Sequence, residues 1–180
     1  MTRGPFVSKH REDELGGYGA DVLIHQYAYF ALASTRVAAA EITARLGIEP
    51  DEVVVRGSRQ AVPVRPARHW WRVVCRKPGL TVDDQIAQIV DRLFDHAERI
   101  GELAVELDRI EEGPGGGSVL QVVRVFEHPE GEEEDLTSPV EGWQKLPGQH
   151  QLLGWHLDTR ALEFLRLTRA ELDVDEYAYG

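Results

Sequence analysis

The sequence predicts an α+β fold: a ferredoxin-like βαββαβ core extended by a further β-α-β unit, with the sheet covered by helices. Three observations lead to this fold class. Apolar residues alternate with a period of two in several short segments, and they recur every three or four residues in others. Capping residues, glycines and prolines separate these segments. The 180 residues, 42% hydrophobic and 28% charged, have the composition of an ordinary globular domain.

The first predicted strand follows an N-terminal stretch of different character. Residues 1–22 combine glycines and charges with little apolar periodicity, so we expect a flexible tail before a single α+β domain over residues 23–180. Residues 27–33 then alternate in polarity. This alternation predicts a strand with Tyr27 and Tyr29 on the same face.

A helix and a short strand are expected next. Ser34 and Thr35 are residue types that favour an N-cap, and Gly47 stands where a C′ glycine ends a helix. Apolar residues repeat at helical spacing between them. Residues 52–56 are rich in β-branched side chains, which predicts a short strand.

The strand predicted over residues 69–76 has two different faces. Trp71, Val73 and Cys75 alternate toward one side, which we expect to face the core. The opposite side carries the residues Trp70, Arg72, Val74 and Arg76. Because the first and third strands of a βαββαβ sheet are central neighbours, the tyrosines of the first strand are expected beside this second side.

The strongest helical pattern covers residues 81–108. Thr81 is its expected cap, and apolar residues form one stripe along its length, which predicts a single long helix across the sheet. Glycines and a proline at residues 113–118 end it. Residues 119–127 are apolar on both faces, so we expect a central strand that is covered on both sides.

The last predicted elements follow an acidic loop that reaches residue 148. Residues 151–157 predict a strand, and residues 172–179 predict another that closes the chain. Between them, residues 158–168 predict a helix capped by Asp158. The complete order is therefore β-α-β-β-α-β-β-α-β.

Charge is distributed unevenly along the chain. The formal net charge is −11, yet residues 53–82 contain no acidic residue. The candidate binding residues of this segment are Arg56, Arg59, Arg65, Arg68, Trp70 and Arg72. Arginines beside aromatic rings on an open sheet are typical of RNA or phosphate recognition. The negative net charge and the missing glycine-aromatic RNA-binding motif argue against it, so RNA or a phosphorylated ligand is the alternative partner.

An acidic run is the second candidate surface. Glu132, Glu133 and Glu134 lie in the loop of residues 127–147, where a block of like charges suits contact with a basic partner. Our leading hypothesis is therefore a non-enzymatic protein-interaction module, of the kind that immunity and inhibitor proteins represent. An enzyme whose site is assembled from dispersed residues is the remaining alternative.

The sequence contains no motif for a cofactor or a metal, and we expect neither. It has no P-loop, no zinc-protease helix motif and no nucleophile elbow. Cys75 has the alternation of a buried structural cysteine. Asp173, Asp175 and Glu176 lack the glycine-turn loop of a calcium site, and the histidines lack ligand spacing.

The expected location is the cytoplasm. A single cysteine excludes an internal disulfide. No apolar run approaches the ~20 residues that span a bilayer. The N-terminus also lacks the apolar stretch of a signal peptide, so we expect no membrane partner.

One stretch of the sequence is distinctive. Residues 40–57 are AEITARLGIEPDEVVVRG, in which the LGIEP motif at residues 46–50 is followed by a short strand and Gly57. A strand with two tryptophans, a long helix and the closing LDVDEY at residues 172–177 come later. Over residues 25–179 the chain resembles the bacterial family known as domain of unknown function 4279. The resemblance implies a compact bacterial cytoplasmic domain and transfers no catalytic residue.

Overall fold

The computed structural model describes residues 23–58, 67–111, 117–127 and 154–179, so the predicted tail at 1–22 lies outside the described residues. Its strands are β1 (Leu23–Ser34), β2 (Glu52–Val54), β3 (His69–Cys75), β4 (Gly117–Glu127) and β5 (Glu171–Tyr179). They form one sheet in the order β2-β3-β1-β4-β5, in which β4 and β5 are parallel and the other neighbours antiparallel. The predicted α+β class is confirmed.

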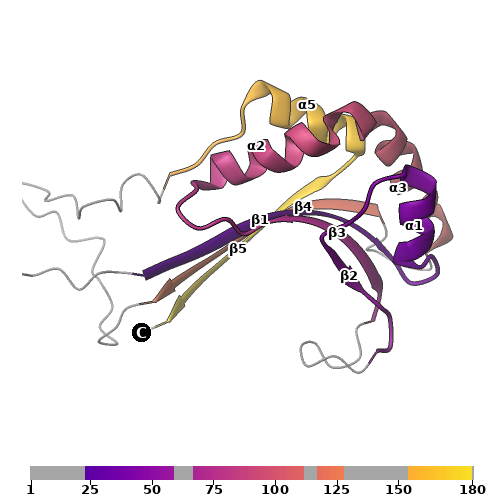
Figure 1. Cartoon of the computed structure of the whole chain (residues 1–180), viewed down its shortest axis with the longest axis horizontal. Coiled ribbons are helices and arrows are strands. Elements are labelled where there is room, and N and C mark those ends of the chain that lie inside the picture. Colours follow the sequence, from indigo (N-terminus) through magenta and orange to yellow (C-terminus); the bar gives the residue numbers. More distant parts are fainter. Residues whose placement is uncertain (1–22, 59–66, 112–116, 128–153, 180) are drawn as a thin grey trace, which may run out of the picture.

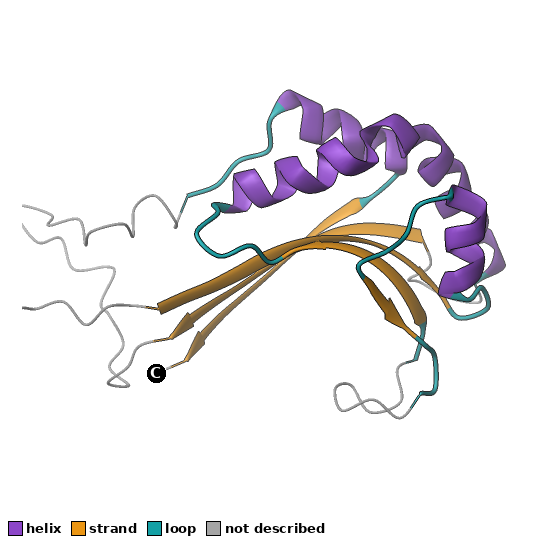
Figure 2. Ribbon diagram, in the orientation of Figure 1, coloured by secondary structure: helices purple, strands orange, loops and turns teal. Residues whose placement is uncertain are grey.

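The described helices all lie on one side of this sheet (Figure 1, Figure 2). They are α1 (Ala39–Leu46), α2 (Val82–Leu93), α3 (Ala97–Ile110) and α5 (Thr159–Thr168). The strands arch beneath them, so the side of the sheet away from the helices is concave (Figure 2).

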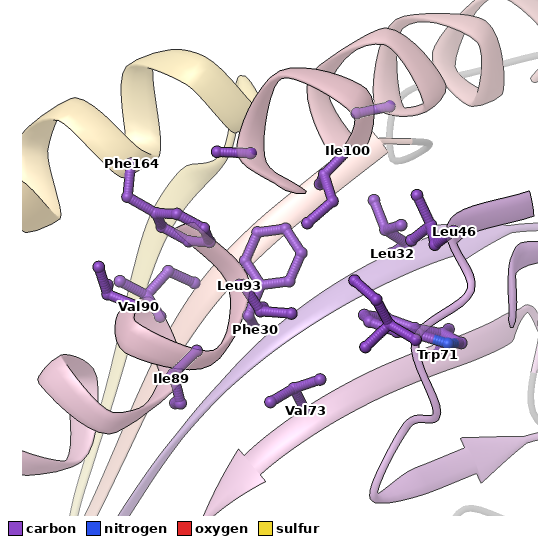
Figure 3. Packing of buried hydrophobic residues seen from close by; sticks show 14 of the residues in the cluster. Phe30, Leu32, Leu46, Trp71, Val73, Ile89, Val90, Leu93, Ile100 and Phe164 are labelled. Carbon is purple, nitrogen blue, oxygen red and sulfur yellow. The ribbon is translucent and has the colours of Figure 1, made fainter. Parts of the chain in front are cut away.

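The core fills the space between the sheet and this helix layer. Phe30, Leu32 and Trp71 point from the strands toward Leu93 and Phe164 on the helices, and all five side chains are fully buried (Figure 3). The Phe30 and Phe164 rings meet edge to face with their centroids 5.3 Å apart. Each such side chain contributes about 1.5–3 kcal/mol by leaving water, which makes this layer the main source of stability.

Described helices cover β4 on one side only, and its cover on the second side stays a prediction, although Gln121 and Val123 on that side are buried. Leu120 and Val122 pack under the helices. Val119, Val123 and Val125 face the other way, where they pack against side chains of neighbouring strands rather than under a described helix. β4 is interior to the sheet, as expected, because β5 lies at its outer side.

The first helix begins later than predicted, at Ala39. Ser34 and Thr35 do not cap it, because Ser34 Oγ accepts hydrogen bonds from the backbone N–H groups of Arg36 and Val37 in a turn that precedes the helix. Both hydroxyls donate hydrogen bonds, of 2.8 and 2.7 Å, to the carboxylate of Glu111. The predicted end of this helix is confirmed. Gly47 has a φ of 69°, a left-handed conformation that glycine adopts without strain.

The single helix predicted over residues 81–108 is interrupted. A 3₁₀ turn, Phe94–His96, separates α2 from α3, although it contains neither glycine nor proline. The break redirects the chain: α2 packs on β1 and β3, whereas α3 packs mainly on β4 and α5. The approach of α3 to α5 is very close, since a Cβ atom on Gly101 would lie 2.1 Å from the Leu167 carbonyl oxygen.

The strand predicted over residues 151–157 is wrong where the structure describes it, from residue 154 onward. The backbone N–H of His156 donates to Asp83 Oδ1 at 2.7 Å, so this segment is tied to α2 instead of the sheet. The predicted cap of the next helix is confirmed, because the Asp158 side chain accepts a hydrogen bond from the backbone of the first turn.

Candidate binding face

The side of the sheet away from the described helices, called the open face below, carries alternate residues of each strand. The prediction for β3 is confirmed, since its core-facing residues pack under the helices and Trp70 and Arg72 lie on the other side. β1 is the neighbouring strand, and it places Tyr27 and Tyr29 beside the arginines of this segment. The open face is therefore the candidate binding surface.

The centre of the open face is apolar. Tyr29, Ala31 and Val123 are buried there without a described helix above them. Half-buried neighbours pack around them, namely Tyr27, Trp70, Val74, Val119 and Val125. Among the described residues no further layer lies over this apolar cluster, and its half-buried members are the part that a partner could contact.

An arginine stripe, Arg72 and Arg76, borders this centre at β3. The guanidinium carbon of Arg72 lies 4.7 Å from the ring centroid of Tyr29 and 4.9 Å from that of Trp70. The guanidinium carbon of Arg76 lies 4.2 Å from the ring centroid of Tyr27. Each such cation–π contact stabilises by about 0.5–2 kcal/mol, so the arginines are held against the rings.

An acidic stripe, Glu171, Asp173 and Asp175, lies at the opposite side of the open face on β5. The side-chain amide of Gln121 donates a hydrogen bond to Asp175 Oδ2 at 3.0 Å. Within the described residues, no lysine or arginine forms an ion pair with these three carboxylates. The stripe therefore presents carboxylates without a close ion pair in this part of the chain, although Arg68 and Arg169 line the same pocket as Glu171 and Asp173.

Tyr29 lies between the two charged stripes. Burial raises the pKa of its phenol above the ordinary value. Arg72 opposes this shift, whereas Tyr27, Asp175 and Asp173 add to it. The phenol therefore stays neutral at physiological pH and keeps its hydroxyl proton for a hydrogen bond.

A pocket of about 370 Å³ opens at the end of the open face where β4 and β5 begin. Arg68 and Arg169 line it together with three carboxylates, Asp108, Glu171 and Asp173. Arg169 has a φ of 60°, which is uncommon for a residue other than glycine. The mixed charges of the lining suit a small molecule that carries both signs.

The structure separates the predicted binding residues into groups. Trp70 and Arg72 lie on the open face, and Arg68 lines the end pocket. Arg56 lies apart from them, and its Nη1 donates to the backbone carbonyl of Thr35 at 2.7 Å. The remaining candidates lie outside the described residues: Arg59, Arg65, Glu132, Glu133 and Glu134.

Sequence reasoning missed the acidic stripe, because Asp173, Asp175 and Glu176 were considered only as cation ligands. Glu176 lies on the other side of β5, where Arg124 Nη1 pairs with it at 2.6 Å. The available signal was the alternation of acidic and apolar residues over 171–175. On an edge strand that pattern predicts one acidic side.

The structure also places the predicted core cysteine. Cys75 is buried, and its Sγ lies 3.6 Å from Gln88 Oε1.

Within the described ranges, no group of three or more His, Cys, Asp or Glu side chains is arranged to hold a metal ion. None of the helices in this part of the chain has the length and apolar character needed to cross a membrane.

The comparison with protein families gives a match to a described family. The family described as domain of unknown function (DUF4279) matches residues 24–179, a range that includes the whole open face. Neither a curated protein nor a solved structure matches the chain. The resemblance based on the LGIEP motif is confirmed, and the chain belongs to the DUF4279 family of domains of unknown function.

Proposed function

We propose that this protein is a non-enzymatic binding module that recognises another protein through the open face. The observation that carries the proposal is an apolar centre without a described helix over it, with the arginine stripe on one side and the acidic stripe on the other. Stable protein interfaces combine an apolar core with charges that complement those of the partner. A cytoplasmic immunity- or inhibitor-type protein fits this proposal, because such a protein acts by covering its partner.

We also assign the first four strands and their helices to the ferredoxin-like arrangement. The order β2-β3-β1-β4 and the antiparallel pairing of all these neighbours support the assignment. β5 then adds a parallel strand beside β4. The described helices all lie on one side of the sheet (Figure 2), so the proposed partner would bind the other side.

The geometry favours a protein over a nucleic acid. Stacking of bases needs free ring faces, and Arg72 already lies over the rings of Tyr29 and Trp70. The acidic stripe on the same face would repel phosphates, as would the net charge of −11. A phosphorylated ligand in the end pocket would meet two arginines, Arg68 and Arg169, but also three carboxylates, which suits a phosphate less well than a ligand that carries both charges.

A photo-crosslinking amino acid at Val125 tests the proposal in the full chain. Val125 is half-buried on the open face, so we expect one dominant protein adduct in cells of the source organism. Val119→Glu places a charge among the half-buried apolar side chains of the open face, and it should abolish that adduct while leaving the circular dichroism spectrum unchanged.

The matched control carries the same amino acid at Ala87, which is exposed on α2 in the helix layer. We expect no dominant adduct from this position. The same adduct from both positions, a nucleic-acid adduct, or no adduct from Val125 would each refute protein binding by the open face.

The end pocket favours a second candidate function, the binding of a small zwitterion such as a free amino acid. Its carboxylate would meet Arg169, and its ammonium group would meet Glu171 or Asp173. Thermal unfolding with each standard amino acid should identify one that raises the Tm of the wild type and not of Arg169→Gly. A rise of equal size in the variant, or no rise with any amino acid, would exclude this site.

A further inference from the structure

The two edges of the sheet differ in length. One edge is β2, which has only three residues, Glu52–Val54. The other edge is β5, whose nine residues, Glu171–Tyr179, all pair with β4 on their inner side. From Glu171 to Tyr177, every residue except Asp175 is exposed. Among the described residues, no strand pairs with the outer side of β5, so β5 is the longer edge that a partner could reach.

The backbone of β5 offers a row of hydrogen-bonding groups at this edge. Successive residues of a strand point their N–H and C=O groups to alternate sides, so about half of those of β5 point away from β4. An extended chain that lies beside them can pair with them and continue the sheet. The backbone hydrogen bonds then supply affinity, and the neighbouring side chains decide which sequence is bound.

The side chains of β5 form two different surfaces beside this edge. The acidic stripe lies on the open face. Leu172 and Val174 lie on the other side of the strand, where they are 40% and 39% exposed. Their neighbours on β4 in the same register, Leu120 and Val122, are fully buried. The helix layer therefore covers the apolar side of β4 but leaves that of β5 for contact with an added strand.

The acidic stripe disfavours a second copy of β5 as the added strand. Two copies of β5 paired antiparallel would bring both acidic stripes together on one side of the joined sheet, and like charges directly opposite each other are destabilising. A strand with Lys or Arg at alternate positions would instead place opposite charges across the pair. Its remaining positions would lie beside Leu172 and Val174, where apolar side chains fit.

We propose that the outer edge of β5 binds an extended segment of a partner protein in which basic and apolar residues alternate. The basic side chains lie beside the acidic stripe, and the apolar side chains cover Leu172 and Val174. This inference goes beyond the proposed function, because it assigns a partner to the edge of the sheet and does not require the apolar centre of the open face. The crosslinking experiment at Val125 tests that centre independently.

Binding of synthetic peptides to the full chain tests the edge site. The fluorescence anisotropy of a labelled peptide GKVKVKVG should rise with the protein, whereas GKKKVVVG, which has the same composition without alternation, should bind about 10-fold more weakly. N-methylation of the valines removes the donors on one edge of the peptide, and N-methylation of the lysines removes those on the other. One methylated peptide should therefore lose binding and the other should retain it.

Asp173→Lys reverses the middle charge of the acidic stripe. It should weaken the binding of GKVKVKVG by about 5-fold, because one opposite-charge pair becomes a like-charge pair. The variant should bind GKVEVKVG, whose central charge is also reversed, more tightly than the wild type does, which shows in addition that the variant is folded. Glu102→Lys is the matched control, since it makes the same type of change on exposed α3 and should leave both affinities unchanged.

Four results would each overturn the proposal. They are no binding of GKVKVKVG, equal binding of the alternating and the clustered peptide, equal binding of the two methylated peptides, and unchanged peptide preference in Asp173→Lys.

Discussion

On the covered face of the sheet, Phe30, Leu32 and Trp71 are fully buried beneath helices, whereas on the open face Tyr29 and Val123 are 9% and 8% exposed between charged stripes. Because side chains alternate along a strand, the same strands supply both faces. Burial alone therefore does not distinguish the core from the candidate interface. The charged neighbours do, because their carboxylates and guanidinium groups need water or a partner.

The largest expected difference in stability between the two faces comes from substituting the two adjacent tryptophans of β3. Trp71→Ala removes a fully buried ring and its Nε1 hydrogen bond to Thr43 Oγ1, so we expect the free energy of unfolding to fall by about 3–5 kcal/mol. Trp70→Ala removes a half-buried ring that stacks on Arg72 and should cost about 1–2 kcal/mol. Urea denaturation measures both. Equal losses would mean that the open face is part of the core.

Addition of a methyl group tests how closely each side is packed. Gly101→Ala would bring a Cβ atom to 2.1 Å from the Leu167 carbonyl oxygen, so α3 and α5 must separate at a cost of about 1–3 kcal/mol. Val125→Ile adds a methyl group on the open face, and its effect should stay within about 0.5 kcal/mol. Thermal unfolding compares the two variants. A neutral Gly101→Ala would indicate that the helix layer is loosely packed.

At the end of β1, Glu111 accepts hydrogen bonds from Ser34 and Thr35. Burial works to raise the pKa of Glu111, but the hydrogen bonds from Thr35 and Ser34 outweigh it and hold that pKa below the ordinary value of 4.5. The resulting stability is present above pH 4.5 and is lost as the pH falls through the lower pKa of the folded state.

Glu111→Gln should therefore lower the free energy of unfolding by about 1–2 kcal/mol near neutral pH. Denaturation measured over an acid pH series should bring the wild type and the variant together as the carboxyl group becomes protonated. A difference that persists through this range would mean that the charge of Glu111 contributes nothing to the attachment.

The side-chain alternation of β1 and β3 was sufficient to predict which residues face the core, because it follows from strand geometry alone. The break at residues 94–96 could not be predicted locally, since no glycine or proline marks it. It depends on how α3 packs against β4 and α5. The caps proposed at Ser34 and Thr35 do not form on α1, because Ser34 Oγ accepts from the backbone of a separate turn before the helix. Both hydroxyls donate to Glu111, which is distant in the sequence.

Only part of the candidate site could be predicted from the sequence. The arginine stripe followed from the pattern of β3, and its tyrosine neighbours followed from the expected strand order. The acidic stripe became part of the same face only through the parallel pairing of β4 with β5, two strands separated by a long stretch of chain. A single strand pattern contains no information on which strand will be its neighbour.

The smallest expected effect concerns Arg169, which ends α5 beside the pocket at the end of the open face. Gly47 ends α1 in the same left-handed conformation with φ of 69°, and it lines no such pocket among those described. Arg169→Gly should raise the free energy of unfolding by about 0.5–1 kcal/mol, because glycine adopts this conformation without strain. Urea denaturation measures the gain.

Arg169→Gly also removes a cation from the pocket. If the pocket binds a zwitterion, the substitution should therefore raise the free energy of unfolding and lower the affinity for the ligand. A more stable chain that has lost ligand binding would mean that Arg169 serves binding in the pocket, and that its left-handed conformation lowers the stability of the end of α5. A less stable chain would mean that the arginine side chain holds α5 against its surroundings. The pocket would then be a gap at the edge of the helix layer, and binding would belong to the open face alone.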